Sequence, residues 1–144
     1  MSDQQLHLSL INNRVEVARL TAAVDAFARA NGISDDDLHN IHLILDELVI
    51  NVIKYAYADT RPHTIDVRLG LQGTLLTIVI EDDGRPYDPT ARPAPNLDLP
   101  IEQRPIGGLG VHIVKTLSDS FVYRRVDDRN VVTVTRTIRR VPPA

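Results

Sequence analysis

The sequence predicts a two-layer α/β sandwich, in which a mixed, mostly antiparallel sheet carries about three helices on one face. Three observations indicate this fold. Short segments of alternating hydrophobicity, typical of half-buried strands, stand near both ends of the chain. Two longer segments with helical periodicity occupy the first half. The predicted elements follow the order β-α-α-β-β-loop-α-β-β, with no internal repeat.

The chain begins with a predicted strand and two predicted helices. Leucines alternate with polar residues between positions 6 and 10, which indicates a short strand. Apolar residues then recur at intervals of three and four from position 14, and Gly32 stands where a helix commonly ends. The second helix is expected over 38–57. Ser34 is its natural N-cap, and acidic residues follow where the helix dipole favours them.

The second half combines strands with one long loop. The apolar segment at 75–81 is expected at the centre of the sheet. Residues 82–106 hold most of the chain's nine prolines, and long loops of this kind in small domains are usually functional or disordered. The other predicted elements are a strand at 64–71, a helix at 111–117, and strands at 120–126 and 131–139 joined by a turn at 128–130.

Composition excludes several classes of function. The 144 residues fit one domain over 1–144, and the absence of cysteine excludes disulfides, thiolate metal sites and cysteine nucleophiles. The net charge of −3 argues against nucleic-acid binding, and the arginines between 124 and 140 are expected on a solvated face. The chain shows neither an apolar run of the roughly 18 residues that a membrane span needs nor the features of a signal peptide. We therefore expect a cytoplasmic protein.

The helix at 38–57 carries the first candidate site. It is apolar nearly all round, so we expect it to be heavily buried. Glu47 and Asn51 are one turn apart and point the same way, and Lys54 continues that edge. A buried carboxylate is costly unless it has a partner. Two interpretations remain open: an ordinary surface contact among these side chains, or a pair that faces a wet cleft.

Two further clusters follow along the chain. Asp82-Asp83-Gly84 follows the central strand and forms either a simple turn or the wall of a pocket. In the pocket, the carboxylate would accept a hydrogen bond from an exocyclic amine such as that of adenine. Gly107-Gly108-Leu109-Gly110 opens a helix, where free N–H groups favour an anion, although these glycines would equally allow close helix packing. It matches neither a P-loop nor the dinucleotide fingerprint.

The ordered set of three clusters resembles the GHKL superfamily of ATP-binding domains, over about residues 6–140. Residues 47–51 are similar to its N-box, 82–84 to its first glycine box and 107–110 to its second, which makes 85–106 the ATP lid. The resemblance implies a Bergerat-type fold. Within the superfamily the chain is most similar to the small bacterial anti-sigma-factor serine kinases, at residues 51–57, 84–89 and 107–110.

The chain departs from the family pattern at two places. Proline occupies position 86, where the first box often has a second glycine, and its fixed φ makes that side of the pocket less permissive. The last strand begins with Asn130-Val131, where the family often has Gly-Thr. No functional role is assigned to a residue there.

The resemblance implies a site that binds ATP and Mg²⁺. Asp82 would receive the adenine amine, Asn51 would ligate Mg²⁺, and Glu47 would orient or deprotonate a serine hydroxyl. Positive charge would come from Lys54 or Arg104. The implied nucleotide-binding residues are Asn51, Lys54, Asp82, Gly84, Gly107, Gly108, Leu109, Gly110 and Val111.

The resemblance also implies an activity and partners. The protein would be an ATP-dependent protein serine/threonine kinase that phosphorylates a serine of an anti-anti-sigma protein. It would bind a sigma factor as its second partner and form a homodimer. From the net charge and the apolar runs we expect no direct contact to nucleic acid or membrane. Two alternatives remain: a non-catalytic ATP-binding switch that gates a protein partner, and an interaction domain that has lost its nucleotide, which Pro86 favours.

Overall fold

The computed structural model describes residues 4–91 and 108–141 of the chain. Its elements are β1 (Gln4–Ile11), α1 (Glu16–Ala30), α2 (Asp35–Tyr55), β2 (Thr64–Gln72), β3 (Leu75–Asp82), the short 3₁₀ helix η1 (Pro89–Ala91), α3 (Gly108–Leu117), β4 (Ser120–Val126) and β5 (Arg129–Thr137). The element order is the predicted one, and most boundaries shift by only a few residues.

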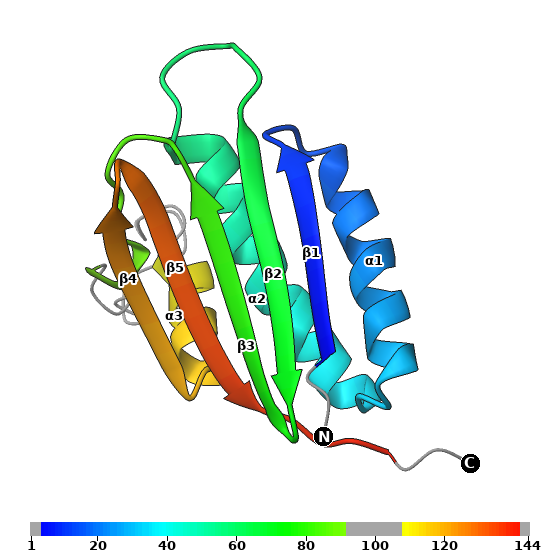
Figure 1. The fold of residues 1–144 in the computed structure, drawn as a ribbon. Coiled ribbons are helices and arrows are strands. Elements are labelled where there is room, and N and C mark those ends of the chain that lie inside the picture. The colour runs from blue at the N-terminus through cyan, green and yellow to red at the C-terminus, as the bar shows by residue number, and fades with distance from the viewer. Residues whose placement is uncertain (1–3, 92–107, 142–144) are drawn as a thin grey trace.

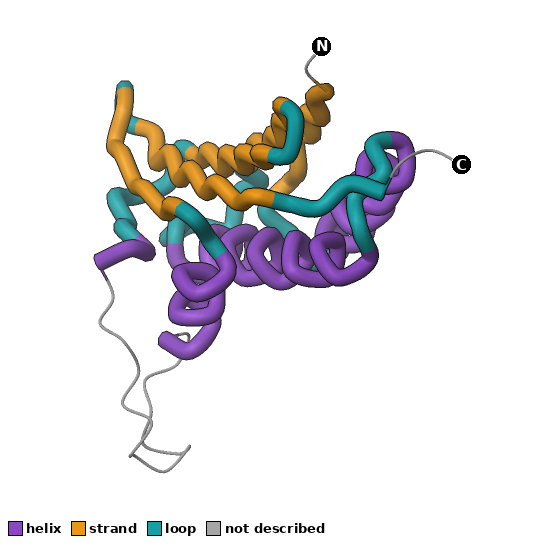
Figure 2. The backbone as a smooth tube through the Cα atoms, turned by 90° about the horizontal axis from the view of Figure 1, so that it is seen from below, coloured by secondary structure: helices purple, strands orange, loops and turns teal. Residues whose placement is uncertain are grey.

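The strands form one sheet in the order β1-β2-β3-β5-β4. Every pairing among these described strands is antiparallel. The prediction of a mixed sheet allowed for some parallel pairing, and the described strands show none. The α-helices lie together on one face of the sheet, and the other face is open (Figures 1 and 2). The predicted α/β sandwich is confirmed. No helix within residues 4–91 and 108–141 is long and apolar enough to cross a membrane.

The core lies between the sheet and α2. Alternate residues of β2 and β3 point toward the helices and are fully buried, as the alternating pattern requires. Burying one such aliphatic side chain contributes about 1.5–3 kcal/mol. The α2 side of this core is formed by Ile41, Ile44, Leu45, Leu48 and Val49. A helix with this many buried positions has little freedom to rotate, so its polar side chains are held in defined directions.

The N-terminal end of α2 is capped as predicted, although the helix begins at Asp35 rather than at position 38. The Ser34 hydroxyl accepts a hydrogen bond from the Asp37 N–H at 3.2 Å. Ser34 also donates to the Asp37 carboxylate at 2.8 Å. The cap supports the first turn and accounts for the earlier start of the helix. At its other end α2 stops at Tyr55, two residues before the predicted boundary.

The predicted turn of the last hairpin is wrong, and the predicted solvated arginine face holds in part. The turn is Asp127-Asp128, with φ of 51° and 61°, and β5 already begins at Arg129. Two central residues with positive φ match the twist of a two-residue hairpin, and aspartate tolerates this conformation. The arginines expected on a solvated face are exposed at positions 124, 125, 139 and 140, whereas the other two are half-buried. Arg129 pairs with Asp66 at 3.3 Å and Glu81 at 3.4 Å, and Arg136 pairs with Asp37 at 3.1 Å.

Candidate functional site

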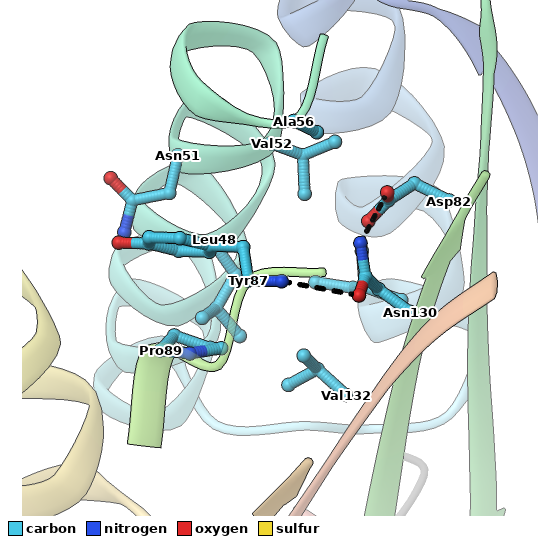
Figure 3. Close-up of a pocket in the computed structure, with 10 residues that line it drawn as sticks. Leu48, Asn51, Val52, Ala56, Asp82, Tyr87, Pro89, Asn130 and Val132 are labelled. Atoms are coloured by element: carbon cyan, nitrogen blue, oxygen red, sulfur yellow. Dashed lines mark hydrogen bonds between the residues drawn. The ribbon is translucent and has the colours of Figure 1, made fainter. Parts of the chain in front are cut away.

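A pocket lies beside the C-terminal half of α2, where β3 ends and β5 begins (Figure 3). Its free volume of about 20 Å³ has room for about one water molecule. Tyr87 and Pro89, in the segment that starts the predicted lid, form part of its wall, so a larger ligand needs that segment to move away. The pocket is lined by Leu48, Asn51, Val52, Ala56, Ile80, Asp82, Tyr87, Pro89, Asn130 and Val132.

Asp82 supplies the carboxylate among the residues that line this pocket. It is the last residue of β3, and only 3% of its surface is exposed. The Gly84 N–H donates to Asp82 Oδ1 at 2.8 Å, and Asn130 Nδ2 donates to the same oxygen at 2.9 Å. No hydrogen bond from the described part of the chain ends on Oδ2. Burial raises the pKa of Asp82, although these two hydrogen bonds oppose the shift.

The structure gives Gly84 a packing role. A Cβ at this position would lie 2.5 Å from the Ala56 carbonyl oxygen and 2.6 Å from the Ala56 Cβ. The next residue, Arg85, donates its N–H to the same carbonyl at 2.9 Å. Gly84 therefore lets the strand end approach the end of α2 and brings Asp82 close to the helix. Its predicted role, to leave room for a base, stays a prediction.

Asn51 is buried in the pocket wall, with 5% of its surface exposed. Its Nδ2 has no hydrogen-bond partner within residues 4–91 and 108–141. A buried unpaired amide group costs about 1–3 kcal/mol. Such a group in a pocket wall is typical of a side chain that meets a ligand.

Glu47 lies one helical turn before Asn51 and does not line this pocket. Its carboxylate instead lies against Gly110 in α3, where an added Cβ would overlap all three carboxylate atoms. A side chain at position 110 would push the carboxylate away. The glycine of the predicted second box thus leaves the space that the Glu47 carboxylate occupies between α2 and α3.

The structure brings together only part of the predicted set. Asn51 and Asp82 line one pocket, and Glu47 and Gly110 are in contact beside it. Lys54 is exposed and does not line the pocket, and Val111 is buried in the core. Gly108 and Leu109 begin α3, and nothing more is described of them. Gly107 and Arg104 lie outside the described residues, as do positions 92–106 of the lid.

Besides the apolar wall, the sequence analysis did not assign Tyr87, Pro89 or Asn130 to the pocket. The Gly84-Arg85-Pro86-Tyr87-Asp88-Pro89 segment was singled out as similar to a family motif, but that similarity does not indicate which side chain enters the pocket. Tyr87 stacks on Tyr55 of α2 with ring centroids 5.8 Å apart. For Asn130 the available signal was its departure from the family's Gly-Thr.

Comparison with known proteins supports the sequence resemblance. Residues 12–136 match the family model described as the histidine kinase-like ATPase domain. A serine-protein kinase RsbW from Bacillus licheniformis is 28% identical over 131 residues, which are 88% of this chain and 80% of the relative. Another, from Bacillus cereus, is 28% identical over 130 residues, which are 88% of this chain and 79% of that protein.

Solved structures share the fold. A crystal structure of RsbU and RsbW domains from Mycobacterium tuberculosis superposes with a TM-score of 0.69 and 16% identity, over 94% of this chain and 32% of that one. A blue-light activated histidine kinase from Erythrobacter litoralis gives a TM-score of 0.56 and 16% identity, over 86% of this chain and 41% of that one. The chain therefore spans less than half the length of these structural neighbours, and at this identity they support the fold alone.

Proposed function

Because the chain belongs to the histidine kinase-like ATPase domain family, we propose that it is an ATP-dependent protein serine kinase. Its phospho-acceptor is a serine of an anti-anti-sigma protein, and a sigma factor is its second partner. The reaction type is supported by the similar proteins named serine-protein kinase, whose alignments cover most of this chain. The observation that carries the proposal is one pocket that holds both the Asp82 carboxylate, with Oδ2 available to a ligand, and the buried side-chain amide of Asn51.

The pocket chemistry suits adenine. Apolar side chains from α2 and the sheet form most of the wall, and a flat base packs well against such surfaces. Asp82 Oδ2 is the acceptor for the exocyclic amine. The base enters when the segment with Tyr87 and Pro89 moves outward, so nucleotide binding is coupled to the start of the lid. The phosphates extend toward the N-terminus of α3, where the helix dipole and free N–H groups favour anions.

The residues present also fit Mg²⁺. The side-chain amide oxygen of Asn51 is a hard ligand of the kind that Mg²⁺ accepts, and the ion commonly keeps several waters and shares phosphate oxygens. The described residues contain no group of three or more acidic or histidine side chains that could hold a metal. Asn51 would therefore share the ion with the phosphates and water. When bound, Mg²⁺ would neutralise charge on the transferred phosphoryl group.

We assign Glu47 to the phosphoryl-transfer step. Its contact with Gly110 sets the carboxylate beside α3, at the end of the site where we place the phosphates. Glu47 orients the acceptor serine and takes its hydroxyl proton as the serine oxygen bonds to the γ-phosphorus. The bond between that phosphorus and the β–γ bridging oxygen breaks, and ADP leaves. Lys54 is exposed, and we assign it only a supporting positive charge near the phosphates.

The test combines binding and transfer. With Mg-ATP at a hundredfold excess over Kd, we expect the chain to be stabilised by about 2.7 kcal/mol in a thermal-shift assay. Mixed with ATP and the anti-anti-sigma proteins of its own organism, it should add one phosphoryl group to one of them, as measured by intact mass and located on a serine by peptide mapping. Binding without transfer to any of them would favour the alternative, a non-catalytic ATP-binding switch. No binding would overturn the proposal.

The proposal includes three assignments beyond the reaction. The chain is treated as one domain over residues 1–144, with its lid at about 85–106, that works as a homodimer in the cytoplasm. Sedimentation of the purified chain with and without ATP tests the dimer, because a single monomeric species under both conditions contradicts it.

A further inference from the structure

Asn130 is the other buried polar residue at the end of this pocket. It is the second residue of β5 and lies directly opposite Asp82 in the antiparallel ladder between β3 and β5. Only 3% of its surface is exposed. A buried amide at this place is costly unless its donors and acceptor are paired. Its contacts therefore indicate what it does.

The amino group of Asn130 fixes one oxygen of Asp82. Nδ2 donates to Asp82 Oδ1 at 2.9 Å and to the Arg85 carbonyl oxygen at 2.8 Å, which uses both of its protons. Together with the Gly84 N–H, Asn130 gives Oδ1 two donors. The carboxylate cannot rotate without losing both bonds, so Oδ2 is the oxygen left for a ligand (Figure 3).

The oxygen of Asn130 is fixed from the other side. Oδ1 accepts hydrogen bonds from the Tyr123 hydroxyl at 2.6 Å, from Arg125 Nη1 at 3.1 Å and from the Tyr87 N–H at 3.4 Å. Turning the amide over would place its NH₂ group against three donors. The orientation of Asn130, and through it that of Asp82, is therefore determined by groups from β4 and from the segment after β3.

We propose that Asn130 is a positioning residue that sets base specificity by holding Asp82 with only Oδ2 available to an exocyclic amino group. This inference rests on the proposed ATP-binding function. A purine with an amine at the matching position pairs with Oδ2, whereas a purine without one leaves a buried carboxylate oxygen unpaired. A carbonyl oxygen in that position, as in guanine, would face the carboxylate acceptor to acceptor. Asn130 thus selects adenine nucleotides over other purine nucleotides.

The experiment compares two ligands on the full chain with Mg²⁺. ATP and purine riboside triphosphate differ only in the exocyclic amine, and the readout is the ratio of their Kd values. A hydrogen bond to a charged group contributes about 1.5–3 kcal/mol, so wild type should prefer ATP by roughly 10- to 150-fold. Asn130→Ala leaves the Gly84 N–H as the one described donor that still holds Asp82 Oδ1, so the carboxylate is less firmly oriented and the preference for ATP should fall. Partial unfolding lowers both apparent affinities equally and does not change the ratio.

Tyr123→Phe is the matched control. It removes one donor to Asn130 Oδ1 but leaves the Asn130–Asp82 bond, so the wild-type ratio should be kept. The inference is overturned if Asn130→Ala keeps that ratio, or if wild type does not distinguish the two ligands. The kinase proposal fails on a different result. In that case the chain binds ATP and prefers it over the other purine nucleotide, but transfers no phosphoryl group to any acceptor.

Asn130→Asp is a second variant that preserves shape. At low pH the two neighbouring carboxyl groups share a proton, and the protonated one donates in place of the amide. At higher pH both ionise and repel, so the preference for ATP should fall as pH rises, whereas the wild-type ratio should not. The other titratable or charged groups that face this pair are Tyr57, Asp83, Tyr123 and Arg125. If Asn130→Asp showed the wild-type ratio of Kd values at every pH, the positioning role would be contradicted.

Discussion

The two ends of α2 each lie beside a buried aspartate, and the two carboxylates are held differently. At the N-terminal end, Asp37 Oδ1 accepts from Arg136 at 3.1 Å, while Oδ2 accepts from the Ser34 hydroxyl at 2.8 Å and the Arg139 N–H at 2.7 Å. At the C-terminal end, both described donors to Asp82 meet on Oδ1. Both oxygens of Asp37 therefore accept hydrogen bonds from the fold, whereas Asp82 Oδ2 remains available to a ligand.

The two environments shift the pKa values in opposite directions. Burial by itself would raise the pKa of Asp37, but the hydrogen bonds from Arg139, Ser34 and Arg136 outweigh it and hold the pKa below its usual value. Burial prevails at Asp82 and raises the pKa. A saturated buried charge stabilises the fold, whereas a raised carboxyl pKa in a pocket is typical of a functional site. Substitutions at the two ends should therefore separate stability from activity.

The largest effect is expected beside the pocket, at Glu47. Glu47→Gln removes the proposed proton acceptor and keeps the shape, so phosphoryl transfer should fall by a factor of about 10² to 10⁴. ATP affinity should stay near the wild-type value. Asp46→Asn, which changes the neighbouring half-buried carboxylate, is the control and should transfer normally. Full transfer by Glu47→Gln in a labelled-phosphate assay would remove the catalytic role.

The next effect is on stability, at the other end of the helix. Asp37→Ala leaves Arg136 without its partner in a largely buried position, which typically costs about 3–5 kcal/mol. Urea unfolding measures this loss. Asp36→Ala removes an exposed carboxylate of the same first turn and should cost at most about 1 kcal/mol. Equal losses in the two variants would mean that the Asp37 network contributes nothing beyond the helix dipole.

Asp82→Asn, unlike Asp37→Ala, should weaken ATP binding without lowering stability. The amide keeps the shape but replaces a charged acceptor, so ATP affinity should fall by roughly 10- to 150-fold, the usual contribution of a hydrogen bond to a charged group. Stability at neutral pH should not fall, because an ionised side chain is no longer buried. Asp83→Asn, at an adjacent residue whose side chain is 50% exposed, is the control in nucleotide titrations. A loss of affinity in that control and not in Asp82→Asn would contradict the assignment of the adenine acceptor.

The smallest effect is the pH dependence of stability, and its sign differs between the two ends. The lowered pKa of Asp37 contributes stability above the unfolded pKa of about 3.9, which is lost as pH falls through the folded pKa. The raised pKa of Asp82 costs stability once pH exceeds its folded pKa, and this cost disappears below the unfolded value. Unfolding curves from acid to neutral pH should show Asp37→Asn losing stability relative to wild type as pH rises, and Asp82→Asn gaining it. Parallel curves would contradict both directions.

The family and the element order could be predicted because they depend on local patterns. The alternation in β2 and β3, the periodicity of α2 and its Ser34 cap involve residues only a few positions apart. Asn51 and Glu47 were predicted to share one edge of α2, because helix geometry alone requires it. The hairpin turn was misplaced, because two aspartates with positive φ are not a common turn sequence and the strand twist decides the conformation.

The sequence by itself determined which segments form strands and helices and which polar residues interrupt apolar ones, because neighbouring side chains set the periodicity of burial. Only the tertiary structure decided which of those polar residues meet. Asp82 faces Asn130 through the register of β3 and β5, and Glu47 rests against Gly110 through the packing of two helices. These contacts join positions far apart in the chain, and small changes in register or packing would give different partners without altering any local pattern.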